Sequence, residues 1–189
     1  MKVCIIGQGL VSLVLAKLLI QKKIAVDILI DQKNIKYNKS RTLGISRSNL
    51  NYFCEEIENI KKISWPIDRI KIYTEKNLKD EILKFNSYKE KIFFIVKNHE
   101  LQKLLLKKLK KNSLINFKNV FKLNNILKHR YKLIINCNQN NEISKKFFSK
   151  KIEKNYNSTA FTTIISHKKL PDNNTAFQNF TNNGPIAFL

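Results

Sequence analysis

The hydrophobic and polar positions at the start of the chain change from a strand pattern to a helical one and back. Residues 2–6 form a short apolar run that leads into two closely spaced glycines, and residues 13–22 continue with helical spacing. A second run, 24–30, is rich in β-branched residues and ends at Asp31. This order predicts a central strand, a glycine turn, a helix that begins near residue 10 and a second strand, which together form a parallel βαβ unit.

The rest of the chain contains segments with helical spacing of apolar residues and segments with strand-like apolar runs. Helical spacing predicts helices over 47–57 and 100–111, the second with leucines on one face and lysines on the other. Strand-like runs are expected at 67–74, 81–86, 92–96 and 131–137, and we interpret the last as a buried strand of the parallel sheet. Near the C-terminus, 176–180 and 186–189 predict a hairpin across an Asn-Asn-Gly turn. The pattern indicates an α/β domain into which a sheet-based second domain is inserted.

Charge changes this picture only slightly. The chain carries 36 basic and 14 acidic residues among 189, a net charge of +22. Such a balance ordinarily indicates nucleic acid or an anionic membrane surface as a partner. Here the excess of Lys, Asn, Ile and Phe over Gly, Pro, Ala and Arg is typical of an A/T-rich genome, and we find no aromatic-basic module of the RNA-binding kind. We interpret the lysines as a solvated surface, and a role at a membrane surface stays open.

The cysteines and the start of the chain limit the cellular compartments in which we expect the protein. Three cysteines, far apart and without C-x-x-C spacing, support neither a disulfide framework nor a zinc site. The N-terminus leads directly into a strand without a signal-peptide pattern, and no apolar stretch is long enough to span a bilayer. We therefore expect a cytoplasmic protein whose membrane contact, if any, is peripheral and at the inner membrane surface.

The glycine turn carries the most specific chemistry. Gly7 allows a tight turn and Gly9 a close approach of a pyrophosphate, which would lie on the positive end of the following helix. Ser12 occupies the third position of the G-x-G-x-x-G pattern, where Gly or Ala is usual. Asp31 lies near the spacing of about 20 residues at which an acid binds an adenosine ribose. A βαβ unit with a glycine turn and no nucleotide remains the structural alternative.

Four segments together resemble the FAD-dependent aromatic hydroxylases, and within them the ubiquinone-biosynthesis hydroxylases. They are residues 7–12 with Asp31, the segment Arg41-Thr-Leu-Gly-Ile-Ser46, the strand-to-helix corner 96–101, and the pair 176–180 and 184–189 with its Gly-Pro-apolar strand. They cover most of this chain but only about the N-terminal half of such an enzyme. Because the chain stops within a strand-like run, we expect it to be a fragment.

The resemblance implies a fold and a set of site residues. The fold is α/β, with a Rossmann-like FAD-binding domain around a parallel central sheet and part of an inserted mixed or antiparallel-sheet substrate domain. The implied domains are 1–70 and 91–155 for FAD binding, and 71–90 and 156–189 for the substrate domain. The implied FAD-binding residues are Gly7, Gly9, Leu10, Val11, Ser12, Asp31, Arg41 and Asn98, and the implied substrate-binding residues are Gln178 and Phe180.

Single residues in this set have simpler alternatives. Arg41 could bind two phosphate oxygens or be an ordinary surface arginine, and Asn98 could approach the flavin or be a helix N-cap. We assign no catalytic residue and no metal, because the cofactor carries the chemistry and His99, His129 and His167 have no ligand spacing. Replacing Asp31 by Ala should weaken FAD binding by about 1–3 kcal/mol.

Two departures from the family pattern concern the cofactor. The Asp-Gly motif that the family places after the core strand falls at Asn138-Gln139, which keeps hydrogen-bonding capacity but loses the charge and adds a Cβ. The family's later Gly-Asp flavin segment falls beyond Leu189. We therefore expect the 189-residue chain alone neither to retain stoichiometric FAD nor to oxidise NAD(P)H.

The function implied by the resemblance is hydroxylation of an aromatic, polyprenylated phenol in ubiquinone biosynthesis. FAD would be the cofactor, with NAD(P)H and O₂ as co-substrates, and partners would be the small aromatic substrate and other quinone-biosynthesis proteins rather than a specific nucleic acid. Two alternatives stay open. The chain could belong to another FAD- or NAD-dependent oxidoreductase, or to a basic peripheral binding protein that retains a Rossmann-like shell.

Overall fold

The chain forms two compact units. The computed structural model describes residues 2–30, 38–75, 81–86, 90–119, 131–148, 150, 152–166, 168 and 173–189. Unit 1 comprises residues 1–38 and 99–162, and unit 2 comprises residues 39–98 and 163–189. The chain therefore passes between the units three times. Residues 39–70, which we placed with the FAD-binding part, cluster in unit 2.

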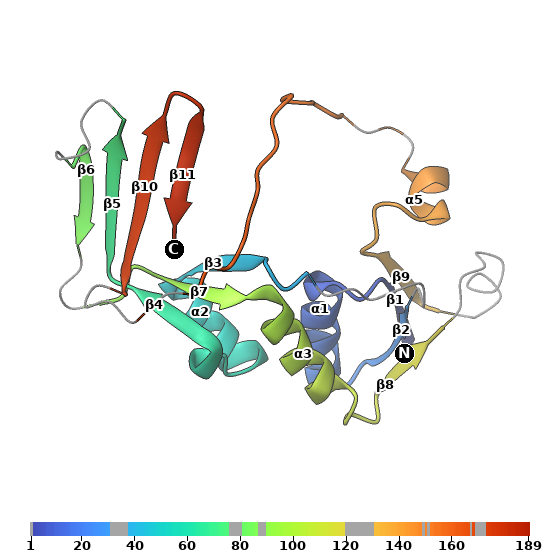
Figure 1. Cartoon of the computed structure of the whole chain (residues 1–189). Coiled ribbons are helices and arrows are strands. Elements are labelled where there is room, and N and C mark those ends of the chain that lie inside the picture. The colour runs from blue at the N-terminus through green and yellow to red at the C-terminus, as the bar shows by residue number, and fades with distance from the viewer. Residues whose placement is uncertain are drawn as a thin grey trace. The chain divides into compact units, whose positions relative to one another are not determined.

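Unit 1 is built on a parallel sheet. Its strands are β1 (Lys2–Ile6), β2 (Ala25–Leu29), β8 (Ile115–Lys118) and β9 (Leu133–Asn136), in the order β8-β2-β1-β9 (Figure 1). β1 pairs in parallel with β2 on one side and β9 on the other. The predicted parallel βαβ unit, with its first strand in the interior of the sheet, is confirmed.

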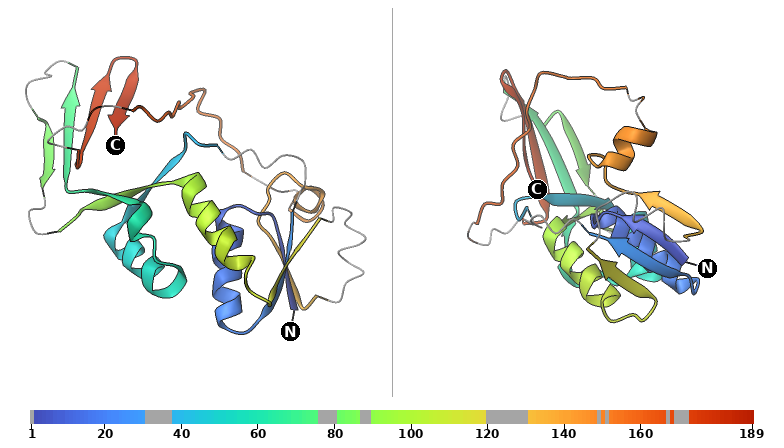
Figure 2. Two further views of the ribbon diagram at one scale, coloured as in Figure 1. Left: turned by 60° about the horizontal axis from the view of Figure 1, so that its bottom comes forward. Right: turned by 90° about the vertical axis from the view of Figure 1, so that its right-hand side faces the viewer.

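Among the described residues, three helices accompany this sheet: α1 (Leu10–Gln21), α3 (Asn98–Leu109) and α5 (Glu142–Phe147). Leu13, Ala16 and Ile20 of α1 are buried, as the helical spacing predicted. Figure 2 shows α1 against the sheet from two further directions. On the face formed by Cys4, Ile6 and Leu29, the partly buried side chains of Tyr131 and Ile143 complete a small apolar cluster.

The predicted burial of the strand at 131–137 is wrong. β9 is parallel, as expected, but Leu133 and Ile134 have exposed fractions of 51% and 36%. Among the described residues β9 has one neighbour, β1, and so lies at the edge of the sheet. An apolar run has the same appearance in a central strand and in an edge strand, and the sequence pattern alone cannot separate the two.

Unit 2 contains two smaller sheets. The first has the order β3-β7-β4, from β3 (Thr42–Ser46), β7 (Phe93–Lys97) and β4 (Ser64–Ile67), and is antiparallel. The second has the order β11-β10-β5-β6, from β5 (Arg69–Thr74), β6 (Leu83–Asn86), β10 (Thr175–Thr181) and β11 (Gly184–Phe188). It is mixed, because β10 and β5 run parallel while the other pairs run antiparallel. Strands β3 and β4 were not predicted.

Short helices and a small core complete unit 2. Helix α2 (Arg47–Tyr52) continues into a π-helical turn, Phe53–Ile57, so the helix predicted over 47–57 has the expected extent, and a 3₁₀ turn follows at Lys61–Ile63. Ile67, Ile95 and Ala176 are buried together. The predicted C-terminal hairpin is confirmed, and the predicted fold class, a parallel-sheet α/β unit with an additional mixed or antiparallel sheet, is confirmed as well.

Candidate functional site

The site begins at the turn after β1, where Gly7 has a backbone conformation that favours glycine. Its φ is +110°, and its amide donates to the carbonyl oxygen of Leu29 at 3.0 Å. A Cβ placed on Gly7 would lie 3.4 Å from Ser12 Oγ and 3.5 Å from the carbonyl of Cys137. The turn is therefore both strained for any other residue and closely packed. This agrees with the role that the sequence assigned to Gly7.

Gly9 leaves the start of α1 open. It is the N-cap residue, with extended backbone angles (φ −68°, ψ 173°), and no side chain among the described residues caps the helix there. The first turn of α1 contains no acidic residue, and a Cβ on Gly9 would meet nothing within 4 Å. Because the first amides of a helix have no intrahelical acceptor, Leu10, Val11 and Ser12 present their N–H groups at a positive helix end.

Two further side chains lie beside this turn. Ser12 is fully buried, and in the described part of the chain its hydroxyl has no hydrogen-bond partner. Gln102 of α3 donates from Nε2 to the carbonyl oxygen of Gln8 at 2.9 Å and so supports the turn from a helix 94 positions away. We did not predict Gln102, and no signal in the sequence distinguishes it from other polar residues of α3.

The turn after β9 also lies at the carboxyl ends of the parallel strands, but its own side chains supply hydrogen-bond partners for its polar groups. The side-chain amides of Asn136 and Asn141 bond to each other reciprocally at 3.2 and 2.8 Å. Asn136 Oδ1 also accepts from the amide of Asn138, whose own Oδ1 accepts from the amide of Asn140. Asn141 caps α5 by accepting from the amide of Ser144. The Asn138-Gln139 pair thus lies in a turn that satisfies many of its polar groups with its own side chains.

A buried carboxylate determines the electrostatics of the sheet. Asp27 of β2 is fully buried and lies 2.9 Å from Lys2 Nζ and 2.8 Å from Lys118 Nζ, while the hydroxyl of Tyr131 donates to it at 2.7 Å. Burial alone would raise the pKa of Asp27. The hydrogen bonds from Lys118, Lys2 and Tyr131 outweigh burial and lower this pKa from 3.8 to about 2. Asp27 therefore stays ionised at neutral pH.

The same surroundings make nearby groups unreactive. Burial, followed by the charge of Asp27, raises the pKa of the Cys4 thiol to about 11. Burial and then the hydrogen bond to Asp27 also raise the pKa of the Tyr131 hydroxyl. Neither group ionises near neutral pH, so neither is suited to act as a nucleophile or base there. The Asp27 cluster was not predicted, because its members are far apart in the sequence.

The structure brings Arg41 and Asn98 together in unit 2. The amide of Asn98 donates to the carbonyl oxygen of Arg41 at 3.0 Å, and the side chain of Arg41 is exposed. Asn98 Oδ1 is buried, and no described residue donates to it. The alternative that Asn98 is a helix N-cap is therefore wrong, because an N-cap side chain must accept from the first turn. A buried amide oxygen without a donor at a strand-to-helix corner is suited to contact a ligand.

The two predicted substrate residues lie on one face of the mixed sheet. Gln178 and Phe180 alternate along β10, and the register places Gln178 beside Ile72 of β5 and Ala187 of β11. Phe180 is about half exposed. On β6, which lies beyond β5 in the same sheet, Leu83 and Phe85 are also about half exposed. This face is apolar, with the side-chain amide of Gln178 as a polar group within it.

Several expected residues lie outside the described part of the chain. Asp31, His129 and His167 are among them. His99 lies 4.0 Å from Glu100, and the described residues contain no group of three or more His, Cys, Asp or Glu side chains arranged to hold a metal ion. Unit 2 also has a shallow pocket of about 530 Å³ beside α2, lined by Arg47, Lys61 and Phe94 among others.

No protein-family model matches the sequence, and neither does any curated protein sequence. Solved structures do match. PqsL from Pseudomonas aeruginosa, described as a probable FAD-dependent monooxygenase, has a TM-score of 0.58 and 12% identity over 81% of this chain and 46% of PqsL. PqsL in complex with 2-aminobenzoylacetate has a TM-score of 0.60 and 12% identity over 82% of this chain and 47% of PqsL.

A second solved protein is p-nitrophenol 4-monooxygenase PnpA from Pseudomonas putida. It has a TM-score of 0.51 and 13% identity over 61% of this chain and 31% of PnpA. The chain thus spans less than half the length of each of these proteins. At such identities the likeness establishes a shared fold with these proteins.

Proposed function

We propose that this chain forms the adenosine-pyrophosphate end of an FAD site in an FAD-dependent aromatic monooxygenase. The observation that carries the proposal is the uncapped start of α1 directly after a turn in which Gly7 has a φ of +110°. This arrangement presents free amides and a positive helix end to an anion, and the open space at Gly9 lets a phosphate approach the backbone. The residues of the turn therefore fit a pyrophosphate.

The residues that would hold the cofactor follow from this arrangement. The amides of Leu10, Val11 and Ser12 would donate to the pyrophosphate, and the Ser12 hydroxyl is a further donor without a partner in the described chain. Asp31 would accept from the ribose, and the sequence resemblance gives Arg41 and Asn98 as further cofactor-binding residues. When bound, FAD supplies the redox chemistry with which one oxygen atom of O₂ is inserted into an aromatic ring. The protein's contribution is to position the cofactor and to exclude water.

The substrate class follows from the apolar face of the mixed sheet. Phe180 would pack against an aromatic ring, and the Gln178 amide would bond to its hydroxyl group, so that a phenol fits better than a charged ring. We propose a polyprenylated phenol of ubiquinone biosynthesis as substrate, with NAD(P)H as reductant and other proteins of that pathway as partners. The sequence resemblance supports this finer assignment.

ADP tests the proposal, because it contains the half of FAD that the glycine turn would bind. We expect calorimetric titration of the 189-residue chain to give a binding constant in the micromolar to millimolar range. Gly9→Asp, which introduces a negative charge at the start of α1, should lower the affinity at least tenfold. The matched control Asn112→Asp introduces the same charge in the turn before β8, at the opposite end of the parallel strands, keeps the acceptor for the Leu114 amide, and should leave the affinity within about twofold.

Two results would contradict the proposal. Absence of ADP binding at millimolar concentration would remove the nucleotide site. Equal effects of the two substitutions would mean that ADP binds through the general positive charge of the chain. The alternative of a basic binding protein with a Rossmann-like shell would then be favoured.

A further inference from the structure

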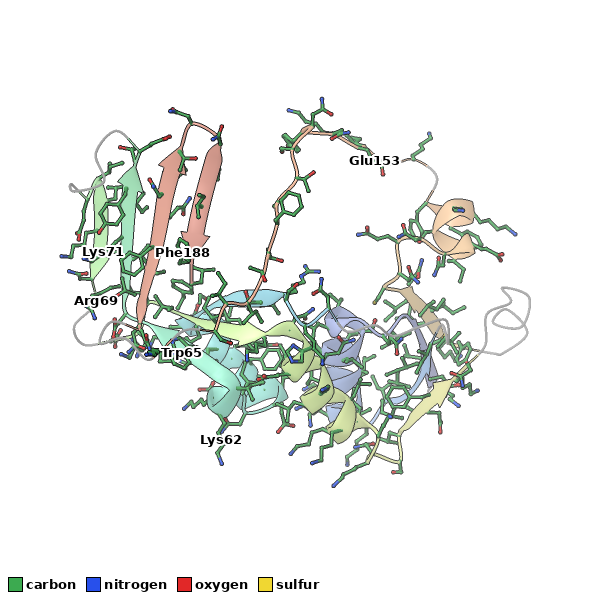
Figure 3. All side chains as sticks on the ribbon, viewed as in Figure 1. Lys62, Trp65, Arg69, Lys71, Glu153 and Phe188 are labelled. Atoms are coloured by element: carbon green, nitrogen blue, oxygen red, sulfur yellow. The ribbon has the colours of Figure 1, made fainter. Side chains whose placement is uncertain are left out.

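The described residues 145–148, 150 and 152–156, which we name the lysine–phenylalanine segment, combine positive charge with exposed apolar side chains. They include four lysines (Lys145, Lys146, Lys150 and Lys154) and one glutamate, together with Phe147, Phe148, Ile152 and Tyr156. The segment begins in α5 and continues through the extended chain of unit 1 that Figure 3 marks with Glu153.

The apolar side chains of this segment are not packed against unit 1. Phe147 and Phe148 have exposed fractions of 57% and 66%, and Ile152 is fully exposed. Helix α3 provides the contrast, because it also carries several lysines but buries Leu101, Leu105 and Leu109. The lysines of α3 thus form the solvated face of an ordinary amphipathic helix. In the lysine–phenylalanine segment both kinds of side chain face solvent.

Rings and ammonium groups also lie next to each other here. Lys146 Nζ lies 5.6 Å from the centroid of the Phe147 ring, and Lys154 Nζ lies 5.1 Å from the centroid of the Tyr156 ring. Side chains with an apolar body and a charged or polar end suit the boundary between lipid headgroups and acyl chains. An anionic lipid surface offers phosphates to the lysines and an apolar layer to the rings and to Ile152.

We propose that the lysine–phenylalanine segment is a docking site for an anionic lipid surface. Charge complementarity selects the headgroups. Phe147 and Phe148 could enter an apolar layer or stack on bases, but the fully exposed Ile152 favours a membrane over a nucleic acid, since an aliphatic side chain gains nothing by stacking on bases. Among the described residues no helix is long and apolar enough to cross a bilayer. The contact is peripheral, and it is independent of FAD binding.

Vesicle co-sedimentation of the 189-residue chain tests the proposal. We expect binding to phosphatidylcholine vesicles in which about a third of the lipid is phosphatidylglycerol, and little binding to phosphatidylcholine alone. Raising the salt from about 0.1 M to about 0.5 M should weaken binding several-fold, because it shortens the range of the surface charge. Equal sedimentation with both kinds of vesicle would overturn the proposal.

Substitutions assign the binding to this segment. Lys145→Gln with Lys146→Gln should lower the vesicle partition coefficient at least tenfold, because each lysine near an anionic surface contributes about fivefold. The matched control, Lys103→Gln with Lys107→Gln, removes the same charge from α3 and should change the partition coefficient less than about twofold. All four lysines are exposed, and circular dichroism would confirm that both variants fold.

A second pair of substitutions and a comparison with RNA distinguish a membrane partner from a nucleic-acid partner. Phe147→Ser with Phe148→Ser should lower vesicle binding about tenfold, because the rings no longer enter the apolar layer. Unchanged vesicle binding in this variant would overturn the proposal, as would equal effects of the two lysine pairs. Single-stranded RNA bound more tightly than the vesicles at the same salt, through the same lysines, would also overturn it in favour of a nucleic-acid partner.

Discussion

Two turns at the carboxyl ends of the parallel strands differ in how the first amides of the following helix find hydrogen-bond acceptors. Each follows a strand and precedes a helix: the glycine turn joins β1 to α1, and the asparagine turn, residues 137–141, joins β9 to α5. At the first, Gly9 leaves the start of the helix without a side-chain cap. At the second, Asn141 caps the helix and Asn136 bonds to the turn that follows it.

The difference indicates where a ligand can be bound by the backbone. Amides that already have side-chain acceptors gain little from a phosphate, while free amides at a helix start gain a full set of charge-assisted bonds. The two turns are also adjacent, since a Cβ on Gly7 would lie 3.5 Å from the Cys137 carbonyl. A pyrophosphate would therefore be held by the glycine turn, with the asparagine turn as a neutral neighbour.

The largest expected effect lies in the sheet from which both turns emerge. Asp27→Asn should lower the free energy of unfolding by about 2–4 kcal/mol at pH 7, because Lys2 and Lys118 lose their common partner. The folded pKa of Asp27 is lowered from 3.8 to about 2, so its stabilisation is present above about pH 4 and is lost as the pH falls toward 2. Urea unfolding at pH 7 and near pH 3 checks both statements. A difference between parent and variant that does not shrink at the lower pH would contradict them.

The next prediction is that the two glycines of the first turn differ in how much stability is lost when each is replaced by alanine. Gly7→Ala should cost about 2 kcal/mol of stability, since alanine rarely adopts a φ of +110°. Gly9→Ala, in ordinary extended backbone with open space around it, should change stability by less than about 0.5 kcal/mol. Denaturant unfolding of both variants measures this. Equal costs would mean that the turn is not strained at Gly7.

The asparagine turn is expected to depend on its own side chains. Asn136→Ala removes the reciprocal amide pair with Asn141 and the acceptor of the Asn138 amide, and should cost about 1–2 kcal/mol. Gln139→Ala, at an exposed position of the same turn, is the control and should have little effect. Thermal unfolding followed by circular dichroism distinguishes them. If Asn136→Ala left the stability unchanged, the turn would not rely on this network.

A change of the asparagine turn toward the family's Asp-Gly motif should raise nucleotide affinity slightly. Asn138→Asp with Gln139→Gly restores the charge and removes a Cβ, and we expect ADP or FAD affinity to rise by up to about fivefold, or about 1 kcal/mol. The gain is small because the Asn136–Asn141 pair still occupies the turn. Calorimetric titration measures it. A loss of affinity would mean that the asparagine turn already contributes to the site as it stands.

The smallest expected change in stability belongs to Gly9→Asp, and it has the opposite sign to the effect of this substitution on binding. Gly9→Asp places an acidic N-cap on a helix that has none and should raise the free energy of unfolding by about 0.5 kcal/mol, while it weakens ADP binding. Unfolding and titration on the same preparation test the pair of signs. A variant that loses both stability and binding would show disruption of the turn in place of charge repulsion.

The comparison of the two turns also shows what the sequence could predict. The glycine turn was predictable because two closely spaced glycines directly between an apolar strand and a helix are typical of a nucleotide-binding turn, and β1, α1 and β2 confirm its setting. The asparagine network was not, because Asn136, Asn141 and Ser144 have ordinary turn and helix-start chemistry in any loop. Only their placement shows that they bond to one another.

Long-range features were the least predictable. Asp27 has partners at positions 2, 118 and 131, and Gln102 supports Gln8 across 94 positions, so no local pattern reports either contact. The exposure of β9 was mispredicted for the same reason, since burial depends on which strands lie beside it. In the site itself, the positions of Gly7, Gly9 and Ser12 followed from the motif, whereas the unpartnered oxygens of Ser12 and Asn98 became visible only in the structure.

The parallel pairing of β10 with β5 has a consequence for synthesis on the ribosome. β5 leaves the exit tunnel long before β10, and the indole N–H of Trp65 bonds to the carbonyl of Asn173, 108 positions later. Unit 1 has its first two strands and α1 within the first 29 residues. The edge of β5 that pairs with β10 therefore stays unpaired in the nascent chain until Thr175–Thr181 has been made, a state that favours aggregation and chaperone binding.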